Sequence, residues 1–434
     1  MGRVDASHKD TLTDMAQAWD RFTGSPQLSE KKITALSWRV IFEAMTQYAT
    51  ATKGSLVLVF DEIQWMSKTG SGFVGSLKEA WQRWEPTGHI KVLICGSSNK
   101  FFYDHVGGDE KTLRGLKTHS DIWVHPFTPH EVKQYYFKKW SLVEVALVYM
   151  MIGGVPYYLN QIEPSQGFIH AINQAFFTKQ TIFLEEIDEL LKLEFYVNAQ
   201  NTVKRILGAL GQDGCELHLI VQKTGLSLAT VSDALHKLLD YQIIFRKLPV
   251  YSKPHKNDGG YRYYMKDFYL NFYYQVLLPH STVIKNNGHG LIFPYSILSA
   301  KTGYFINNFS GKAFELLMRY VLENKSDQNA KVFKVLQLSD ANYTVESYWS
   351  VETQIDLVID HAADRLTRCI ECKWLGHAPD KNILSTLTPQ RRPGKTPKTN
   401  NLRHYLALSQ PWTANFEKMA EKQGIGLLGL PDIF

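Results

Sequence analysis

Two stretches of the chain place carboxylates where they could act on phosphates. In the first, the apolar and β-branched run Ser55–Phe60 ends in Asp61 and Glu62. Such a run predicts a buried parallel strand that delivers both acids to the carboxyl edge of a sheet. At such an edge an Asp helps to hold Mg²⁺, and a following Glu can polarise the water that attacks a nucleoside triphosphate. A polar strand end that faces solvent is the equally weighted alternative.

A site of that kind also needs a loop that holds phosphates, with the pattern G-x-x-x-x-G-K-S/T. The 434 residues contain no such pattern. The segment from Gly70 to Gly75 lacks the following lysine, and the segment from Gly108 to Lys117 has the wrong spacing. The chain therefore carries half of a nucleotide site, and we expect it to bind ATP weakly.

The second stretch lies near the C-terminus and combines two acids with a lysine. Gln354–Asp360 and Thr367–Trp374 have the composition of neighbouring strands, which would bring Asp356 and Glu371 close together. Lys373 follows Glu371 by two residues and should project to the same side. The acids could hold Mg²⁺ or Mn²⁺, and the metal and the lysine together could polarise water and stabilise charge on a phosphate. A solvated salt-bridge cluster is the alternative.

The alternation of side chains along a strand makes this expectation specific. Asp356 should face away from Leu357, and Glu371 and Lys373 should face away from Cys372. If the apolar side is buried, the charged groups converge on the other side of the sheet. The two carboxylates would then lie within reach of a single cation.

The elements that must position these residues change in character along the chain. Helices alternate with apolar strands over residues 1–130, with one strand expected at 122–126, which predicts a parallel α/β sheet. A helical segment, a three-helix block with a hairpin, a connector and a second α/β block follow at 131–197, 198–280, 281–303 and 304–434.

Residues 198–280 have the order of elements that is typical of a winged helix-turn-helix. A Thr-Gly-Leu-Ser turn at 224–227 separates the second and third helices, and a polar, glycine-rich segment at 252–260 separates the two strands. The predicted elements are helices at Val203–Leu210, Leu217–Lys223 and Leu228–Leu239 and strands at Ile243–Lys247 and Tyr261–Met265.

Basic residues favour a nucleic-acid partner, for which we expect DNA. They occur in the three-helix block and in a loop near the second pair of acids, where Asp380 is the only acidic residue. Such residues contact phosphates without reading sequence. A solvated loop, and a winged helix that binds only protein, are the alternatives. The candidates are Lys237, Arg246, Lys247, Lys253, Lys256 and Arg262 in the block and Lys381, Arg391, Arg392, Lys395, Lys398 and Arg403 in the loop region.

Composition places the chain among ordinary globular proteins. Hydrophobic residues make up 44% and charged residues 21%, and the length suggests about two to four domains. The net charge of +6 permits an anionic partner without requiring one. The dispersed cysteines predict neither a disulfide framework nor a zinc site, and no signal peptide is recognisable. Because Glu144 and Pro156 interrupt the apolar run Ser141–Leu159, we expect a core helix in a cytoplasmic protein whose oligomeric state the sequence leaves open.

The order of these motifs resembles that of the archaeal-type ATPase family of the AAA+/STAND superfamily, with a winged helix and a C-terminal PD-(D/E)XK nuclease-like domain. The resemblance covers nearly the whole chain. It rests on the Asp61-Glu62 strand, the strand that ends Cys95-Gly-Ser-Ser98, the Gly153–Leu159 turn, the winged helix and the strand Ile370–Trp374.

This resemblance implies an incomplete P-loop ATPase core, a helical lid, a winged helix and a restriction-endonuclease-like α/β domain. Asp61 and Glu62 match the family's Walker B residues, which bind Mg²⁺ and activate water, and Ser97 or Ser98 matches the residue that senses the γ-phosphate. Glu315 matches an acid on the first helix of the nuclease-like domain and would complete its metal shell.

Two departures from the family bear on ATP. The family begins with a strand, a phosphate loop and a helix, and we expect that N-terminal segment to be missing from this chain. The family's Gly-Arg-Arg after the sensor strand reads Gly115-Leu116-Lys117 here, with Arg114 one residue early. ATP is thus implied for the intact family and is not expected to serve this chain well.

Two functional hypotheses follow. The first is a DNA-associated protein of this ATPase family whose C-terminal domain is a metal-dependent nuclease. The second is a non-catalytic DNA-binding or regulatory scaffold with degenerate ATPase and nuclease folds. An acidic side chain from a helix beside Asp356 and Glu371 would favour the first, and a metal site filled by other side chains would favour the second.

Overall fold

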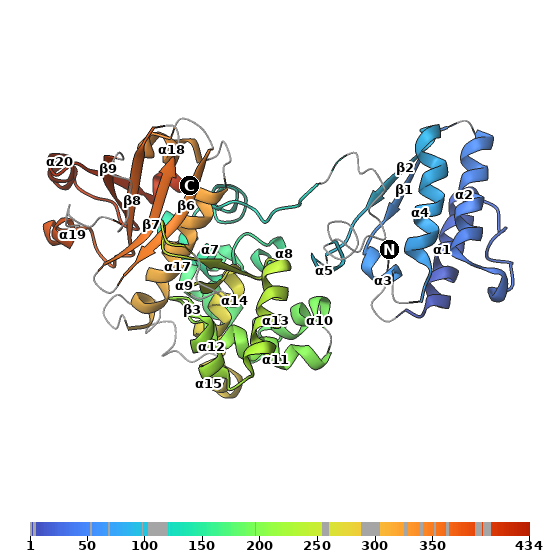
Figure 1. Ribbon diagram of the computed structural model, residues 1–434, viewed down its shortest axis with the longest axis horizontal. Helices are drawn as coiled ribbons and strands as arrows, with labels where there is room; N and C mark the ends of the chain where they lie inside the picture. The colour runs from blue at the N-terminus through green and yellow to red at the C-terminus, as the bar shows by residue number, and fades with distance from the viewer. Residues whose placement is uncertain are drawn as a thin grey trace. The chain divides into compact units, whose positions relative to one another are not determined.

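A computed structural model divides the chain into two compact units, Met1–Trp123 and Val124–Phe434 (Figure 1). A two-stranded, a three-stranded and a five-stranded sheet combine parallel and antiparallel pairs, so the protein is of the mixed α/β class. The structure describes residues 2, 6–52, 54–67, 70–97, 99–102, 120, 122–195, 197–253, 260–287, 304–324, 329–338, 342–350, 353–361, 364–386, 393 and 401–434.

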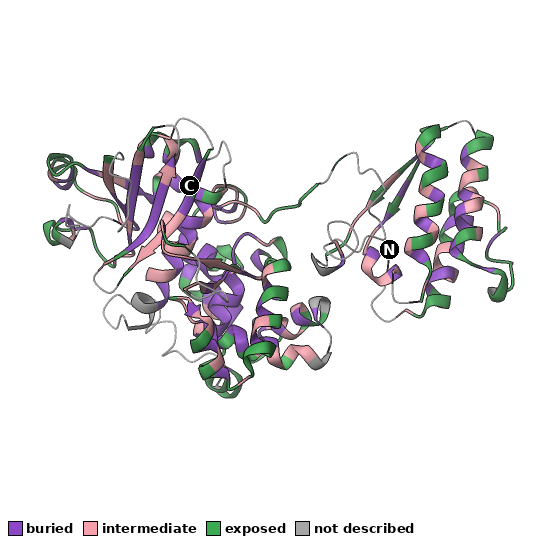
Figure 2. Ribbon diagram, viewed as in Figure 1, coloured by how far each residue is buried: buried purple, intermediate pink, exposed green. Residues whose placement is uncertain are grey.

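The N-terminal unit packs helices against one face of a two-stranded parallel sheet. Its elements are α1 (His8–Thr23), α2 (Trp38–Thr52), β1 (Leu56–Phe60), α3 (Ile63–Met66), α4 (Phe73–Trp84), β2 (Ile90–Ile94) and α5 (Asn99–Phe102), with single 3-10 turns at Ile33–Ala35 and Glu85–Thr87. Burial alternates along β1, so that Leu58 is buried whereas Val57 and Val59 are exposed (Figure 2). The buried face packs on aromatic side chains of α2 and α4, among them Phe42 and Trp84.

Helix ends in both units follow signals that can be read locally. Ser7 and Asp10 form a capping box at the start of α1, in which each side chain bonds the other residue's backbone N–H. Ser141 and Glu144 form the same kind of capping box at the start of the apolar helix Leu142–Ile152. Such boxes satisfy N–H groups that the first turn of a helix leaves without partners. Gly24 ends α1 in the left-handed conformation, which glycine adopts without steric cost.

The prediction of a strand at residues 122–126 is wrong. The structure gives no strand over residues 122–128, and Ile122, Trp123 and Val124 are exposed. The apolar composition of this run resembles that of a strand. A strand also requires a hydrogen-bonding neighbour, however, and no pairing partner for this run occurs in the described part of the chain.

A helical segment opens the C-terminal unit, as the sequence predicts. Its elements are α6 (Pro129–Glu131), a π-helical turn at Val132–Tyr136, α7 (Leu142–Ile152), α8 (Pro156–Leu159), a 3-10 turn at Pro164–Gln166, α9 (Phe168–Phe176), a 3-10 turn at Ile182–Leu184 and α10 (Glu186–Glu194). Eight consecutive residues of α7, Val145–Ile152, are buried, which explains why no charged residue follows Glu144 in this helix. None of the helices in the described residues is long and apolar enough to cross a membrane.

Three helices and a small antiparallel sheet come next. They are α11 (Val197–Leu210), β3 (Cys215–Glu216), α12 (Leu217–Thr224), α13 (Leu228–Asp240), β4 (Ile244–Lys247) and β5 (Arg262–Met265), with the strand order β3-β5-β4. The predicted helices and strands are present, although α11 begins six residues before Val203. Gly225, in the left-handed conformation, ends α12, and the Ser227 side chain caps α13. Two helical pieces, α14 (Phe268–Phe272) with a π-turn at Tyr273–Leu277, and α15 (Ser281–Asn287), complete this region.

The last block is a five-stranded mixed sheet with helices. Its elements are α17 (Tyr304–Glu323), α18 (Ala330–Leu336), β6 (Tyr343–Trp349), β7 (Gln354–His361), β8 (Leu366–Lys373), α19 (Lys381–Thr386), β9 (Asn401–Leu408), α20 (Ala414–Lys422), β10 (Ile425–Gly429) and α21 (Leu430–Ile433). The strand order is β10-β9-β8-β7-β6, with antiparallel pairs from β6 to β8 and parallel pairs from β8 to β10. Helix α17 lies against β6, β7 and β8 (Figure 1). It therefore brings its side chains to the strands that carry the predicted acids.

The segment that follows β4 joins the three-helix block to the edge of this sheet. Pro249 forms an isolated parallel bridge with Ser347 of β6, and the Val250 N–H donates to the Ser347 carbonyl at 2.8 Å. The Lys247 Nζ also donates to the Val345 carbonyl at 2.9 Å. Because β6 is the outer strand of its sheet, these contacts cover an edge whose backbone groups would otherwise lack partners.

Candidate functional site

The acids at the end of β1 lie beside the end of β2 in a network of hydrogen bonds. Ser97 Oγ donates to Glu62 Oε2 at 3.2 Å, and Gln64 Nε2 donates to Ser97 Oγ at 3.1 Å and to the Glu62 carboxylate. Parallel pairing of β1 with β2 brings Glu62 and Ser97 together although 35 residues separate them. Ser98, the other candidate, lies outside the described residues. Gln64 was not predicted, and its place in the first turn after the two acids is the signal that could have identified it.

Asp61 is engaged mainly with backbone. Its Oδ1 accepts the Glu62 N–H at 3.1 Å, and its carbonyl accepts the Gly2 N–H at 2.8 Å. A β-carbon at Gly2 would lie 2.4 Å from the Glu62 carbonyl oxygen, so this approach requires glycine. Glu62 itself has a φ of 53°, a left-handed conformation that is uncommon for a residue with a side chain. The backbone is thus tightly fitted around this strand end.

The C-terminal acids come from three elements of one sheet-and-helix layer. Glu315 lies on α17, Asp356 on β7 and Glu371 with Lys373 on β8. Glu371 Oε1 accepts a hydrogen bond from Lys373 Nζ at 2.7 Å, and Asp356 Oδ2 accepts one from the Cys372 N–H at 2.9 Å. Asp356 is only 8% exposed. The fold therefore holds a buried carboxylate between an acid on the neighbouring strand and an acid on the helix.

The strict alternation expected around Asp356 does not hold. Glu346 pairs with Val358 but Tyr348 pairs with Ile355, so that three steps along β7 match two steps along β6. As a result, Ile355 and Val358 pack in one cluster of the core, while Leu357 packs in another. This irregularity has the character of a β-bulge, which inserts one residue into a strand and redirects nearby side chains. A period-two argument cannot locate such an insertion.

Burial and like charges raise the pKa values of two of these acids. Burial, followed by the negative charge of Asp356, raises the pKa of Glu315 to about 8, against the opposing effect of Lys312. Burial, followed by the negative charge of Glu371, raises the pKa of Asp356 to about 6, although the Cys372 N–H hydrogen bond lowers it. Glu315, Asp356 and Glu371 therefore form an electrostatically linked row, with Asp356 in the middle.

Two lysines neutralise the ends of this row. Lys312 lies 2.8 Å from Glu315 and 3.3 Å from Asp213. Burial lowers the pKa of Lys373, but the hydrogen bond and the charge of Glu371 more than offset it, so the pKa is raised and the amine stays protonated. Lys312 was not predicted. Its position three residues before Glu315 on a helix, the spacing of a helical ion pair, is the signal that was missed.

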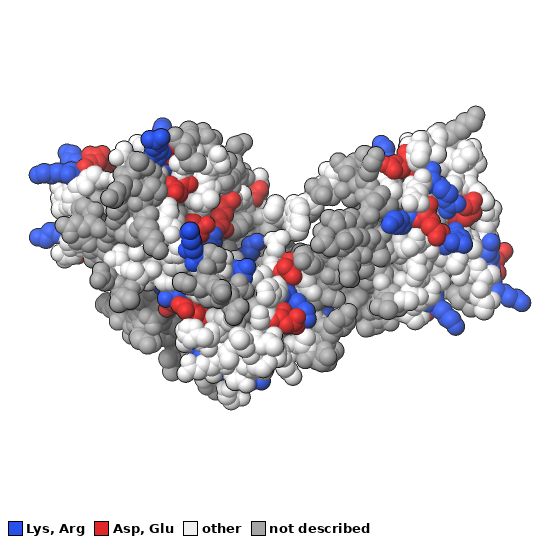
Figure 3. Space-filling view, viewed as in Figure 1, with Lys and Arg blue, Asp and Glu red and all other residues white. Residues whose placement is uncertain are grey.

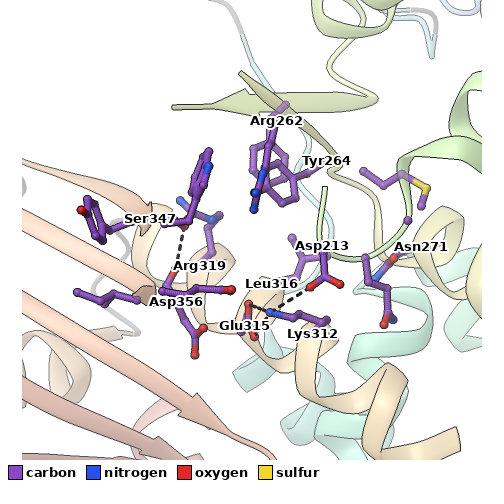
Figure 4. Close-up of a pocket in the computed structure, with 18 residues that line it drawn as sticks. Asp213, Arg262, Tyr264, Asn271, Lys312, Glu315, Leu316, Arg319, Ser347 and Asp356 are labelled. Carbon is purple, nitrogen blue, oxygen red and sulfur yellow. Dashed lines mark hydrogen bonds and ion pairs between the residues drawn. The ribbon is translucent and has the colours of Figure 1, made fainter. Parts of the chain in front are cut away.

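A pocket of about 310 Å³ opens beside Asp356 and Glu315 (Figure 4). Residues from α17, β6 and β7 form one side of it, and residues 211–213 and β5 form the other. Arg262, Lys312 and Arg319 bring positive charge to its lining, and Glu371 and Lys373 are not among the lining residues. No group of three or more His, Cys, Asp or Glu residues within the described ranges is arranged to hold a metal ion.

Most of the basic residues that the sequence predicts to bind nucleic acid in the three-helix block contact other side chains of the protein. Lys237 on α13 pairs with Asp233 at 2.8 Å. Lys247 lies 3.4 Å from Glu346 and 3.7 Å from Glu323. The Arg246 guanidinium lies over the Tyr261 ring, and the Arg262 guanidinium lies over the Trp349 ring. Lys253 is exposed.

Other basic candidates fall outside the structural description or are dispersed. Lys256, Arg391, Arg392, Lys395 and Lys398 lie outside the described residues. Lys381 is exposed, and the Arg403 guanidinium lies over the Tyr405 ring. On the face drawn in Figure 3, described Lys and Arg side chains occur in small groups beside acids. The described surface thus offers scattered rather than continuous positive charge on this face.

The C-terminal acids lie in a segment of the chain that matches a known protein family. A model of the DUF234 family, described as archaeal and bacterial proteins of unknown function, matches residues 274–383, about a quarter of the chain. An uncharacterized protein of Methanocaldococcus jannaschii is 25% identical over 284 residues, which are 65% of this chain and 60% of that protein. The chain therefore spans about 60% of the length of this relative.

Solved structures give only distant likenesses. The Walker-type ATPase of Pyrococcus abyssi is 14% identical, with a TM-score of 0.42 over 62% of this chain and 78% of that one. A Vibrio cholerae protein is 11% identical, with a TM-score of 0.20 over 98% of this chain and 86% of that one. Neither likeness is close enough to support an argument about fold or activity. The family match, by contrast, includes every member of the acid row and both of its lysines: Lys312, Glu315, Asp356, Glu371 and Lys373.

Proposed function

We propose that the C-terminal block of this chain hydrolyses phosphodiester bonds with the help of Mg²⁺ or Mn²⁺, at a site made by Glu315, Asp356, Glu371 and Lys373. The linked row of acids carries the proposal. Burial, together with the charge of Glu371, raises the pKa of Asp356 to about 6, and burial, together with the charge of Asp356, raises the pKa of Glu315 to about 8. Carboxylates held this way are costly to ionise, and a divalent cation would remove that cost.

The donor chemistry suits a hard divalent cation. Mg²⁺ and Mn²⁺ bind carboxylate oxygens, and Glu315, Asp356 and Glu371 would supply them once their side chains move together from the arrangement described above, which is not itself a ready metal site. In the structure Glu315 pairs with Lys312, and Glu371 pairs with Lys373. Asp356 has no ion pair with either lysine in the described contacts, and it would therefore be the first ligand that a cation meets. When bound, the cation would polarise water and the phosphate that it attacks.

Lys373 would supply positive charge to the phosphate in addition to that of the metal. Its amine remains protonated because the adjacent Glu371 raises its pKa. It would stabilise the negative charge that develops on a phosphate during cleavage. Lys312 would instead set the charge of Glu315, to which it is bonded at 2.8 Å.

Nucleic acid, with DNA preferred, is the substrate that this chemistry favours. The order of α17 and the antiparallel strands β6, β7 and β8 supports a PD-(D/E)XK-like domain. The order of α11, α12, α13, β4 and β5 supports a winged helix. Apart from Arg262, which lines the pocket, we assign this winged helix to contacts within the protein, because Lys247 faces β6 and the exposed charges of α13 include Asp233 and Asp240 as well as Lys237. Binding through Arg391, Arg392, Lys395 and Lys398 stays part of the proposal.

The N-terminal unit is proposed to be an ATPase-type core that lacks its phosphate loop. Asp61, Glu62 and Ser97 have the arrangement that a Walker B strand and a sensor strand would give. Without amides and a lysine to hold phosphates, this edge has little affinity for a triphosphate.

Cleavage of DNA in Mn²⁺ tests the proposal. We expect the purified chain to cleave a labelled single-stranded or nicked DNA when Mn²⁺ is present and not in EDTA. Lys373→Ala should abolish this activity while the protein stays folded. Activity that survives both Lys373→Ala and Asp356→Asn would come from a contaminant or from a different site. No cleavage by the wild type on any of these substrates would remove the proposal.

The second candidate is a non-catalytic scaffold, and one observation favours it. Glu315 and Glu371 already form ion pairs with Lys312 and Lys373, so the negative charge of the row is partly neutralised by these lysines. A scaffold would keep this arrangement on adding Mn²⁺, whereas an enzyme would exchange it. Thermal stability that is indifferent to Mn²⁺, together with absent cleavage, selects the scaffold.

A further inference from the structure

One side of the pocket beside the acids is supplied by the three-helix block. Arg262 and Tyr264 of β5 and the turn at 211–213 face α17, β6 and β7 across the cavity (Figure 4). The cavity therefore exists only while the hairpin of β4 and β5 stays against the five-stranded sheet. What holds that hairpin in place decides which ligands can enter the cavity and approach Asp356 and Glu315 from this side.

The hairpin is anchored at several points along its length. Val250 N–H and Lys247 Nζ donate to carbonyls of β6, at 2.8 Å and 2.9 Å. Farther on, Tyr251 Oη lies 3.1 Å from Asp360 Oδ2 and 3.1 Å from Thr367 Oγ1. Val250 is buried in a cluster with Ile355 and Val358 of β7 and Cys369 of β8. This combination of polar and apolar contacts holds the wall of the pocket in one position.

The size of the cavity excludes a double helix from its interior. A volume of about 310 Å³ is at the lower end of pockets for small ligands, which are about 300–1,000 Å³. A duplex, whose major groove alone is about 12 Å wide, does not enter such a space. The terminal nucleotide of a single strand is of the size that does.

The lining of the pocket offers a cationic side chain to a terminal phosphate. Arg262 points into the pocket and is 31% exposed, and its guanidinium lies 4.7 Å from the centre of the Trp349 ring (Figure 4). The neighbouring carboxylate of Glu216 is 3.6 Å from Arg262 Nε, which is too long for a good hydrogen bond. An arginine fork suits phosphate oxygens. Asp356 and Glu315 lie on the opposite side of the same cavity.

We propose that this pocket takes the phosphate-bearing end of a single nucleic-acid strand, with Arg262 on the terminal phosphate, and that the anchored hairpin excludes strands without an end. The inference rests on the proposed function, because Asp356 and Glu315 belong to both. It adds a substrate class, since a nuclease with an open site would also accept circles and duplex interiors.

Binding in Ca²⁺, which occupies oxygen sites and is expected not to support cleavage, tests the inference apart from catalysis. A single-stranded oligonucleotide with an internal dye would be compared in three forms by fluorescence anisotropy: linear with a 5′-phosphate, linear with a 3′-phosphate, and closed into a circle of the same sequence. We expect one phosphorylated linear form to bind about tenfold more tightly than the circle. Equal affinity for both linear forms and the circle would overturn the inference.

Substitutions assign the preference to this pocket. Arg262→Gln should reduce the affinity for the preferred linear form about tenfold and leave the circle unchanged. Arg365→Gln removes the same charge at the exposed turn between β7 and β8, at the end of this strand pair far from Asp356, and should change neither. An Arg262→Gln protein with unaltered preference for an end would contradict the role of Arg262.

Loosening the anchors tests the role of the hairpin as a barrier. Tyr251→Phe combined with Lys247→Gln removes the two hydroxyl contacts of Tyr251, the bond from Lys247 to the Val345 carbonyl and the ion pairs of Lys247 with Glu346 and Glu323, with only small changes in side-chain volume. The variant should bind the circle more tightly, toward the affinity of the linear form, and circular dichroism would check its fold. If this pair of changes unfolds the protein, Tyr251→Phe alone serves, with the same expectation. Unchanged exclusion of the circle would contradict the barrier.

A cleavage assay in Mn²⁺ tests this inference and the proposed function separately. Cleavage of circle and linear forms at the same rate would keep the nuclease and overturn the requirement for an end. End-dependent binding without any cleavage would keep the ligand class and remove the nuclease.

Discussion

Each unit places an acid on or beside a β-strand, Asp61 directly after β1 and Asp356 near the start of β7, but the surroundings of the acids differ. At β1, Asp61 and Glu62 are partly exposed, and Glu62 bonds with the neutral side chains of Gln64 and Ser97. At β7, the buried Asp356 is flanked by Glu371 and Glu315. An acid of a β-strand is thus partly solvated in one unit and part of a buried, electrostatically linked cluster in the other.

This difference indicates where chemistry should be sought. A polar network that is satisfied by neutral partners gains little from an added cation, whereas linked acids in a poorly solvated place gain much. The C-terminal unit also supplies protonated lysines and a cavity beside its acids. The comparison therefore predicts that equivalent substitutions in the two units will have very unequal effects.

The largest contrast is expected in cleavage. Asp356→Asn should lower the rate of Mn²⁺-dependent DNA cleavage by about 10²-fold or more, because it removes a charge that holds the metal. Asp61→Asn, the matched change at the other strand end, should leave the rate unchanged. Single-turnover rates of both variants and of the wild type measure this. A substantial loss in Asp61→Asn would show that the two units share one reaction.

Metal should stabilise the wild type and not the variant in the acid row. At a free Mn²⁺ concentration about 100 times its dissociation constant, binding to the native state alone adds about 2.7 kcal/mol to the free energy of unfolding. Thermal or urea unfolding with and without Mn²⁺ would show this gain in the wild type and in Asp61→Asn. Asp356→Asn should show little of it. Equal stabilisation of all three proteins would place the metal elsewhere.

Stability without metal should fall as the pH rises. The folded-state pKa values of Glu315, about 8, and Asp356, about 6, are raised above the ordinary values of 4.5 and 3.8. The folded state therefore binds more protons than the unfolded state between about pH 4 and about pH 8. This contribution to stability is complete below that range and is lost as pH rises through it.

The variant Glu315→Gln isolates this effect, since it cannot ionise. Urea unfolding in EDTA at about pH 5 and about pH 8 should show that the wild type loses stability relative to Glu315→Gln over this interval. A wild type that gains stability relative to the variant would mean that Glu315 is ionised at the lower pH, and would contradict the electrostatic description of the row.

The smallest effect is expected from ATP. Titration of Mg-ATP into the chain, followed by calorimetry, should give no saturable heat in the micromolar range, because the sequence lacks the phosphate-loop pattern that would have to accompany Asp61 and Glu62. Asp61→Ala serves as the control. Micromolar binding that this variant loses would make the N-terminal unit a working nucleotide site and would reverse the comparison.

Strong local patterns account for what the sequence could predict. The strands that carry Asp61, Asp356 and Glu371 and the helix that carries Glu315 lie close to their expected positions, because their apolar runs and periodicities are long and distinct. The three helices and hairpin of 198–280 also follow from their turns and caps. The expected strand at 122–126 shows the limit of this approach, since composition alone does not provide a pairing partner.

The features that could not be predicted depend on contacts distant in the chain or on a change of register. Nothing in 248–251 indicates that it will bond to Ser347, about a hundred residues later. The irregular pairing near Asp356 depends on the partner strand β6 and not on the sequence of β7 alone. Arg319 was missed as well: it is 6% exposed and bonds to the Val345 carbonyl and the Ser347 hydroxyl, contacts that exist only once α17 has docked on β6.

Direct counting of bound Mn²⁺ tests the central claim that the acid row is a metal site. Free Mn²⁺ would be followed by electron paramagnetic resonance while the ion is titrated into the wild type, Asp356→Asn and Asp61→Asn. The account predicts saturable binding by the wild type and by Asp61→Asn, and loss of that binding in Asp356→Asn. A wild type that leaves all Mn²⁺ free, or an Asp356→Asn protein that binds as the wild type does, would contradict it.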